Sequence, residues 1–236
     1  GNEQSRAQSL AGIGYDCSRD RTLGVAAADG RQVRNLGIDR RPAVRRILLT
    51  LEHLGYVEQV HGRWRLTPRV LSIGQRYTAT HSIVEDARPH LTRLAEETDE
   101  SASLTVLDGT DAVYVARVPV RRILQVDVSP GTRVPATATA MGRVLLAWAG
   151  EPTIARVLAA APPACTPRTV TDPKALRGIL REGHTRGWAL AVGELDPDLM
   201  AVAVPVRDHT GAVVAALASA TSVGRCSPER LVETVL

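Results

Sequence analysis

The first strongly periodic pattern of apolar residues lies between positions 41 and 56, where apolar side chains recur at intervals of three and four residues. The residues in this stripe are Val44, Ile47, Leu48, Leu51 and Leu54. Such spacing is typical of an amphipathic helix with one buried face. Pro42 suits the first turn of this helix and Gly55 suits its C-cap. The pattern therefore predicts a helix over 41–56 with arginines on its exposed side.

Two short β-prone runs follow, at 56–60 and 63–66, on either side of the dipeptide His61-Gly62. A two-residue connection between such runs is typical of a tight hairpin. A helix followed at once by a basic hairpin favours a winged helix-turn-helix module, whose helix enters the DNA major groove while the wing contacts the backbone. An ordinary helix and hairpin within an α+β core would give the same pattern.

The rest of the chain alternates between helical and strand-like patterns. Residues 67–99 are predicted to be helical, with a hinge at 74–80 and a second segment, capped by Ser82, that acts as a linker helix. Strands are predicted at 101–107, 112–118, 123–128, 188–194, 200–206 and 212–219, and helices at 139–148, 153–160, 172–187 and from 227 onward. An antiparallel sheet with helices on its sides, an α+β fold, accounts for this order.

Composition favours a soluble protein. Hydrophobic residues make up 44% of the 236 positions, and no run approaches the roughly 18 to 20 apolar residues of a membrane helix. The opening segment lacks the apolar stretch of a signal peptide, so we expect a cytoplasmic protein without a membrane partner. Cys17, Cys165 and Cys226 are too widely spaced for a CxxC metal motif.

Charge is unevenly distributed along the chain. Residues 1–76 contain 13 arginines and 7 acidic residues, a net charge of +6, whereas residues 77–236 carry a net charge of −2. Asymmetry of this kind indicates binding to nucleic acid. A solvated basic face on an ordinary protein would give the same balance.

Motifs for catalysis are missing from the sequence. It contains no GxSxG, HExxH, Walker or GxGxxG motif, and its six histidines never stand three or four residues apart. Histidines scattered in this way are usually ordinary surface or core residues. We therefore expect no enzyme, no metal site and no cofactor.

One segment invites a ligand. Residues 129–142 lead from a predicted strand into a predicted helix through small side chains, so backbone N–H groups are accessible to a guest. The N-terminus of a helix binds anions through its unpaired N–H donors and its macrodipole. Thr139 as a plain N-cap explains the same residues equally well.

Four segments resemble the IclR family of bacterial transcription regulators. They are RPAVRRILLTLEHLGYV at 41–57, RWRLTPRVLSIG at 63–74, ARVPVRRILQVDVSPGTRVPATATAMGRVLLA at 116–147 and GWALAVGELDPDLMAVAVPV at 187–206. Within the third segment, RVPVRRI and ATAMGRVLLA resemble the branch that regulates aromatic-acid catabolism, the protocatechuate and β-ketoadipate regulators. The resemblance implies a ligand-responsive transcription regulator that binds operator DNA.

The resemblance also implies a domain plan. A winged helix-turn-helix domain is expected over 1–76, followed by a linker helix and a GAF-like effector-binding domain over 77–236, with dimers that assemble into tetramers. Residues 12–40 depart from the family, because they hold five glycines and no apolar stripe where the family has its first two helices. True divergence or a frame change would explain this segment, and a weakened DNA domain would follow. The last predicted helix is short, so we expect it to be truncated.

The expected DNA contacts cluster at the start of the first predicted helix and on the wing. They are Arg40, Arg41, Pro42, Arg45, Arg46, His61 and Arg63. The excess of arginine near a helix N-terminus opposes the macrodipole, and an external anion such as a DNA phosphate would relieve this conflict.

The expected effector pocket lies in the second domain. Its residues are Arg122, Thr139, Ala140, Met141, Gly142, Ala191, Ala201, Ala218, Ser219 and Ala220. Alanines stand where the family's small oxo-acid sensors have polar contacts, so the resemblance implies a larger and less polar cavity. A monocyclic aromatic acid such as protocatechuate would fit, with its carboxylate at the helix start or on Arg122.

Three alternatives remain open at this stage. The alanines would also suit plain core packing, and the Arg121-Arg122 pair would also suit a tetramer interface. The unusual residues 12–40 leave room for a small-molecule binder or enzyme that uses the GAF-like domain without binding DNA. Salt-dependent binding to operator DNA separates that alternative from a regulator.

Overall fold

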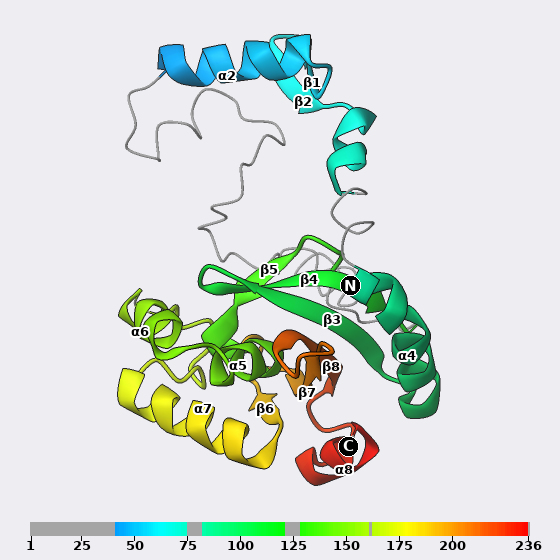
Figure 1. Cartoon of the computed structure of the whole chain (residues 1–236), viewed down its shortest axis with the longest axis vertical. Coiled ribbons are helices and arrows are strands. Elements are labelled where there is room, and N and C mark those ends of the chain that lie inside the picture. The colour runs from blue at the N-terminus through cyan, green and yellow to red at the C-terminus, as the bar shows by residue number, and fades with distance from the viewer. Residues whose placement is uncertain (1–40, 75–81, 121–127, 161, 236) are drawn as a thin grey trace, which may run out of the picture. The chain divides into compact units, whose positions relative to one another are not determined.

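A computed structural model of the chain describes residues 41–74, 82–120, 128–160 and 162–235 (Figure 1). The chain divides into two compact units, residues 1–80 and 81–236. The first unit contains the helix α2 and a two-stranded sheet, and the second contains a six-stranded sheet with helices on both faces. Within the described residues, no helix is long and apolar enough to cross a membrane.

In the first unit, α2 (Arg41–His53) is followed by the strands β1 (Val57–Val60) and β2 (Arg63–Leu66), which pair antiparallel. His61 and Gly62 connect the strands with φ of 50° and 75°, the left-handed backbone of a two-residue hairpin turn. The predicted helix and hairpin are thus confirmed. The 3₁₀ helix η2 (Pro68–Val70) follows, and residues 71–74 are helical.

The apolar stripe of α2 is only partly buried. Val44, Leu48 and Leu51 are half-buried, whereas Ile47 is 59% exposed and Leu54 is 46% exposed. The predicted helix is confirmed, and among the described residues the hairpin after α2 covers only part of its apolar stripe.

The second unit is built around an antiparallel sheet of order β5-β4-β3-β8-β7-β6. Its strands are β3 (Ser101–Asp108), β4 (Asp111–Val118), β5 (Arg133–Pro135), β6 (Ala189–Val192), β7 (Leu199–Arg207) and β8 (Val213–Ser222). Five of these strands match predicted strands, and the sheet and its helices confirm the α+β fold. The strand predicted at 123–128 falls mostly on residues outside the described ranges.

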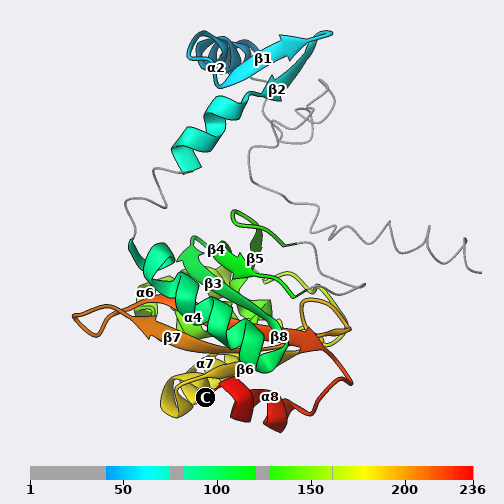
Figure 2. The same ribbon diagram turned by 90° about the vertical axis from the view of Figure 1, so that its right-hand side faces the viewer.

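Helices cover both faces of this sheet. The helix α4 (Ser82–Thr98) lies across one face, as Figure 2 shows, and α8 (Pro228–Val235) packs on β7. The helix α5 (Ala140–Ala147) packs on the other face, and α6 (Glu151–Ala159) and α7 (Pro173–Arg186) lie beside it. The predicted helices are therefore confirmed, with end points that differ by one to three residues.

The alternation of side chains along each strand divides the core into two layers. One layer lies under α4 and contains Val84, Leu91 and Leu104. The other lies under α5 and contains mostly alanines, with Met141 and Tyr114 among them. Small side chains let α5 approach the sheet closely, so α5 and the sheet together form the wall of any site between them.

The short elements β5 and η3 (Ala136–Ala138) do not appear in the sequence-based prediction. They occupy the small-residue segment that leads into α5. A strand of three residues and one turn of 3₁₀ helix are too short to produce a periodic pattern, so only their contacts with β4 and α5 define them.

Candidate effector site and DNA-binding surface

The expected DNA contacts lie on two neighbouring elements of the first unit. Arg41 and Pro42 form the first turn of α2, and Arg45 and Arg46 follow as exposed side chains. Arg40 lies outside the described residues. His61 and Arg63 are exposed on the hairpin, at and directly after its turn. Helix and hairpin thus both offer cations to solvent, as a surface that binds phosphates requires.

Several contacts hold the hairpin against the end of α2. The Thr67 hydroxyl donates to the Gly55 carbonyl at 2.5 Å, and the Arg69 guanidinium stands 5.5 Å from the centroid of the Tyr56 ring. On the wing itself, Arg65 Nε donates to Glu58 at 2.7 Å. This ion pair neutralises Arg65, so Arg63 is the wing arginine without an acidic partner in the described part of the chain.

The expected effector residues come from one end of α5 and from three adjacent strands. In the sheet, Ala191 on β6 pairs with Ala201 on β7, which pairs in turn with Ala220 on β8. Ala218 lies two residues from Ala220 and therefore on the same face. Ala191, Ala201 and Ala218 are buried in one cluster with Ala140 and Met141 of α5, and Ala220 packs against that cluster. The fold thus brings these predicted residues together.

Two predicted residues do not join this group. Ser219 is fully buried, but it lies between Ala218 and Ala220 and points to the opposite face of the sheet, where it pairs in register with Val202 and Ala102. A strand reverses the side-chain direction at every residue, so Ser219 cannot face α5 together with its neighbours. Arg122 lies outside the described residues.

The start of α5 is built around Thr139. The backbone N–H of Gly142 donates to Thr139 Oγ1 at 3.2 Å. Thr139 is therefore the N-cap of α5, which was one of the two interpretations of this segment from sequence. Gly142 has a packing role as well, because a Cβ there would come within 2.2 Å of the Ala136 carbonyl oxygen. The backbone N–H of Gly142 is therefore already occupied.

Two donors remain at this helix start. The backbone N–H groups of Ala140 and Met141 have no acceptor among the described residues, although both residues are buried. The first N–H groups of a helix lack intrahelical partners, and a buried donor without a partner is unfavourable. An acceptor atom of a bound guest would satisfy these two groups, whose residues belong to the same buried cluster as the alanines.

Polar side chains that the sequence did not single out also face α5. Ser103 on β3 pairs in register with Ala218, and Tyr114 on β4 belongs to the same buried cluster as Met141. Burial raises the pKa of Tyr114 to about 12, an effect that the nearby Arg117 opposes in part. The phenol is therefore neutral near pH 7 and remains a hydrogen-bond donor. Sheet register, which the sequence alone does not give, places these residues here.

A buried ion pair fixes α5 relative to the β6–β7 connection. Arg143 binds Glu194 through two hydrogen bonds of 2.6 and 2.5 Å, and its Nε donates to the Thr137 carbonyl at 2.9 Å. The Val170 N–H donates to the same carboxylate at 3.1 Å. Both charges are satisfied, so this pair supports the site rather than recognising a guest. In the sequence, this ion pair is indicated only by an arginine within an otherwise apolar helix.

The residues under α5 are suited to binding a small molecule. Among the described residues, no group of three or more His, Cys, Asp or Glu side chains is placed to hold a metal ion. The cluster under α5 offers apolar walls, a neutral phenol, hydroxyls and helix N–H groups. A basic helix and hairpin in one unit, and a buried cluster with these groups in the other, are the combination expected of a DNA-binding regulator with a sensor domain.

Comparison with known proteins places the chain within this class. Residues 75–236 match the C-terminal domain family of the bacterial transcriptional regulator IclR. The chain is 36% identical to the Pca regulon regulatory protein of Pseudomonas putida, over 98% of its own length and 79% of that protein. It is 33% identical to the p-hydroxybenzoate hydroxylase transcriptional activator of Acinetobacter baylyi, over 83% of its own length and 74% of that protein.

Solved structures agree with this assignment. An IclR transcriptional regulator from Alicyclobacillus acidocaldarius is 27% identical with a TM-score of 0.75, and the match covers 98% of this chain and 93% of that one. An IclR homologue from Microbacterium hydrocarbonoxydans, solved in complex with 4-hydroxybenzoate, is 27% identical with a TM-score of 0.68 and coverages of 82% and 80%. The chain belongs to the IclR family, and it is a ligand-responsive transcriptional regulator rather than an enzyme.

Proposed function

We propose that this protein regulates genes of aromatic-acid catabolism in the cytoplasm and responds to a monocyclic aromatic acid such as protocatechuate. The similarity to regulators named for the Pca regulon and for p-hydroxybenzoate hydroxylase supports this pathway. The observation that carries the choice of ligand is the alanine cluster of β6, β7 and β8 beneath the start of α5. A flat ring needs small neighbours, and a carboxylate needs donors.

In this proposal the carboxylate accepts hydrogen bonds from the free N–H groups of Ala140 and Met141. The macrodipole of α5 favours the negative charge without a buried counter-ion. The ring lies against Ala201 and Ala218, and the neutral Tyr114 hydroxyl donates to an oxygen substituent of the ring. The proposal gives each polar atom of a hydroxybenzoate a partner, which a buried site requires.

Calorimetry on the full chain tests the ligand class. We expect protocatechuate or 4-hydroxybenzoate to bind, and a short oxo-acid such as glyoxylate to bind at least about tenfold more weakly, because it leaves the apolar walls without contact. If glyoxylate binds more tightly than every aromatic acid tried, the ring site is refuted.

The variant Ala218→Leu tests the location. A leucine there fills space beneath α5, so we expect aromatic-acid affinity to fall by about tenfold or more while the protein stays folded. Val214→Leu, near the exposed start of the same strand, is the matched control and should bind like the parent. Unchanged affinity in Ala218→Leu would mean that the alanines only pack the core.

We further propose that the protein binds operator DNA as a dimer, and that dimers pair into tetramers. A dimer places two copies of α2 on half-sites related by two-fold symmetry, so the operator should be an inverted repeat. Analytical ultracentrifugation with and without a selected operator fragment tests the assembly. A monomer bound to a single half-site would contradict it.

A further inference from the structure

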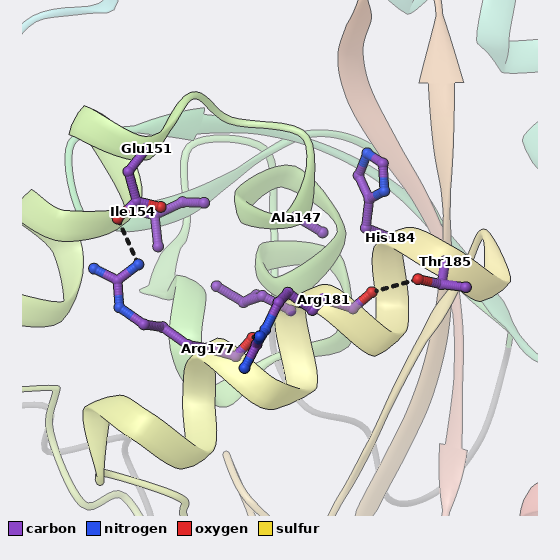
Figure 3. A pocket seen from close by; sticks show the side chains of 8 residues that line it. Ala147, Glu151, Ile154, Arg177, Arg181, His184 and Thr185 are labelled. Atoms are coloured by element: carbon purple, nitrogen blue, oxygen red, sulfur yellow. Dashed lines mark hydrogen bonds and ion pairs between the residues drawn. The ribbon is translucent and has the colours of Figure 1, made fainter.

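A concave site lies away from the alanine cluster. It is a groove of about 490 Å³ between the end of α5, the helix α6 and the helix α7 (Figure 3). The lining residues are Ala147, Glu151, Ile154, Arg177, Leu180, Arg181, His184 and Thr185. The groove lies at the C-terminal end of α5, whereas the proposed effector site lies at the N-terminal end of the same helix.

The floor of the groove is apolar and its rim is basic. Leu180 is only 4% exposed, and Ile154 and Ala147 extend the apolar surface. Arg177 is held at the rim by Glu151 at 2.5 Å. Arg181 Nε makes a long 3.4 Å hydrogen bond to a carbonyl of its own helix, and its guanidinium has no acidic partner among the described residues. The lining of the groove therefore combines one unneutralised guanidinium with an apolar floor.

The His184 ring lines one side of the groove. The His184 ring packs on the Trp148 ring, with centroids 4.9 Å apart and planes inclined by 32°. Arg207 of β7 stands 5.3 Å from the centroid of the same indole. The ring nitrogens of His184 have no hydrogen-bond partner in the described part of the chain. His184 and Arg181 stand three residues apart on α7, and both line the groove (Figure 3). Side chains at this spacing lie on neighbouring positions of one helix face, so a planar guest in the groove can reach both.

We propose that this groove is a second binding site, distinct from the effector pocket, for a planar organic carboxylate. The carboxylate pairs with the free guanidinium of Arg181, for which two parallel hydrogen bonds are the favoured geometry. The planar body covers Leu180 and Ile154 and contacts the His184 ring, which Trp148 supports from behind. A bare phosphate would satisfy the arginine but would leave the apolar floor exposed, so the floor selects an anion with an apolar body.

The proposal is tested by NMR titration of the full chain with benzoate, which reports location as well as affinity. We expect the backbone amide of Thr185 to shift in a saturable way, with a dissociation constant of about 1 mM for so small a ligand. Arg181→Gln should weaken that response about tenfold. Lys174→Gln removes an equal charge from an exposed position on the same helix outside the groove, and should leave the response unchanged.

The following results would overturn the proposed carboxylate site or separate it from the effector site. If Lys174→Gln weakens benzoate as much as Arg181→Gln does, or if inorganic phosphate binds at Thr185 as tightly as benzoate, the site for a planar carboxylate is overturned. Ala218→Leu separates the two sites. It should leave the response at Thr185 intact, even if the effector site under α5 fails, and loss of that response would mean that the groove only follows events in the effector site.

Discussion

At the scale of single residues, the start of α5 packs closely against the backbone of η3. Gly142 sits where η3 and α5 come together, and its missing Cβ is what permits the contact with Ala136. Thr139 caps the helix, and Arg143 ties it to Glu194. Each of these residues therefore positions the two free N–H groups that the proposed effector uses.

Gly142→Ala should destabilise the sensor domain strongly. The added methyl group meets backbone atoms of Ala136, which cannot rotate away, so we expect a loss of about 1 to 3 kcal/mol or more in the free energy of unfolding. Gly178→Ala is the matched control, because a Cβ there meets nothing within 4 Å in the middle of α7. The control should stabilise by roughly 0.5 to 1 kcal/mol. Equal effects of the two variants in urea unfolding would contradict this account.

Glu194→Gln should be costly for a different reason. The variant leaves Arg143 charged, almost completely buried and without a counter-charge, and breaking one partner of a buried pair costs about 3 to 5 kcal/mol. Glu182→Gln breaks the exposed pair with Arg186 and should cost less than about 1 kcal/mol. Thermal unfolding of the two variants measures the difference. A small loss in Glu194→Gln would show that water replaces the carboxylate.

At the scale of elements, the helix α2 and the β1–β2 hairpin are each the size that DNA recognition uses. An α-helix fills the major groove, and a short hairpin reaches the adjacent backbone. Because Arg65 is paired with Glu58, we expect the contacts with DNA to concentrate on the exposed Arg45, Arg46 and Arg63. We therefore expect the helix to read bases and the wing to bind phosphates.

Arg45→Ala should weaken binding to the preferred operator by about 1 to 3 kcal/mol and relax base preference at one position. Arg63→Ala should weaken binding to all sequences alike and reduce the slope of affinity against salt by about one ion. Arg93→Gln, on the exposed face of α4, is the control for lost charge. Gel-shift titrations against a selected operator and a scrambled one measure these effects. An unchanged base preference in Arg45→Ala would remove that residue from the reading surface.

At the scale of the whole molecule, the basic charge and the sensor are assigned to different units. Residues 1–76 carry the net charge of +6, and residues 77–236, with a net charge of −2, fold around the six-stranded sheet. A regulator needs this separation, because DNA affinity comes from charge and salt release, whereas effector affinity comes from a closed and selective site. Linkage requires that effector and operator change each other's affinity by the same factor.

The sequence by itself determined the class of protein and most of the elements. Local patterns can be recognised without knowledge of the tertiary contacts. Examples are the helical periodicity in 41–56 and 172–187, the His61-Gly62 turn and the β-prone runs 101–107 and 112–118. The four segments that resemble the IclR family are also local patterns, and they were sufficient to indicate the family. The capping role of Thr139 was likewise readable from its position before a predicted helix.

Only the tertiary structure decided which residues share a site. Ser219 and Ala218 are neighbours in the chain but face opposite sides of the sheet, and a shift of one residue in register would exchange them. Tyr114 and Ser103 join the alanine cluster through strand pairing, and Arg143 finds Glu194 across 51 positions of sequence. Contacts of this kind depend on how strands pair and how a helix crosses them. A local pattern of residues does not show which distant residues will meet.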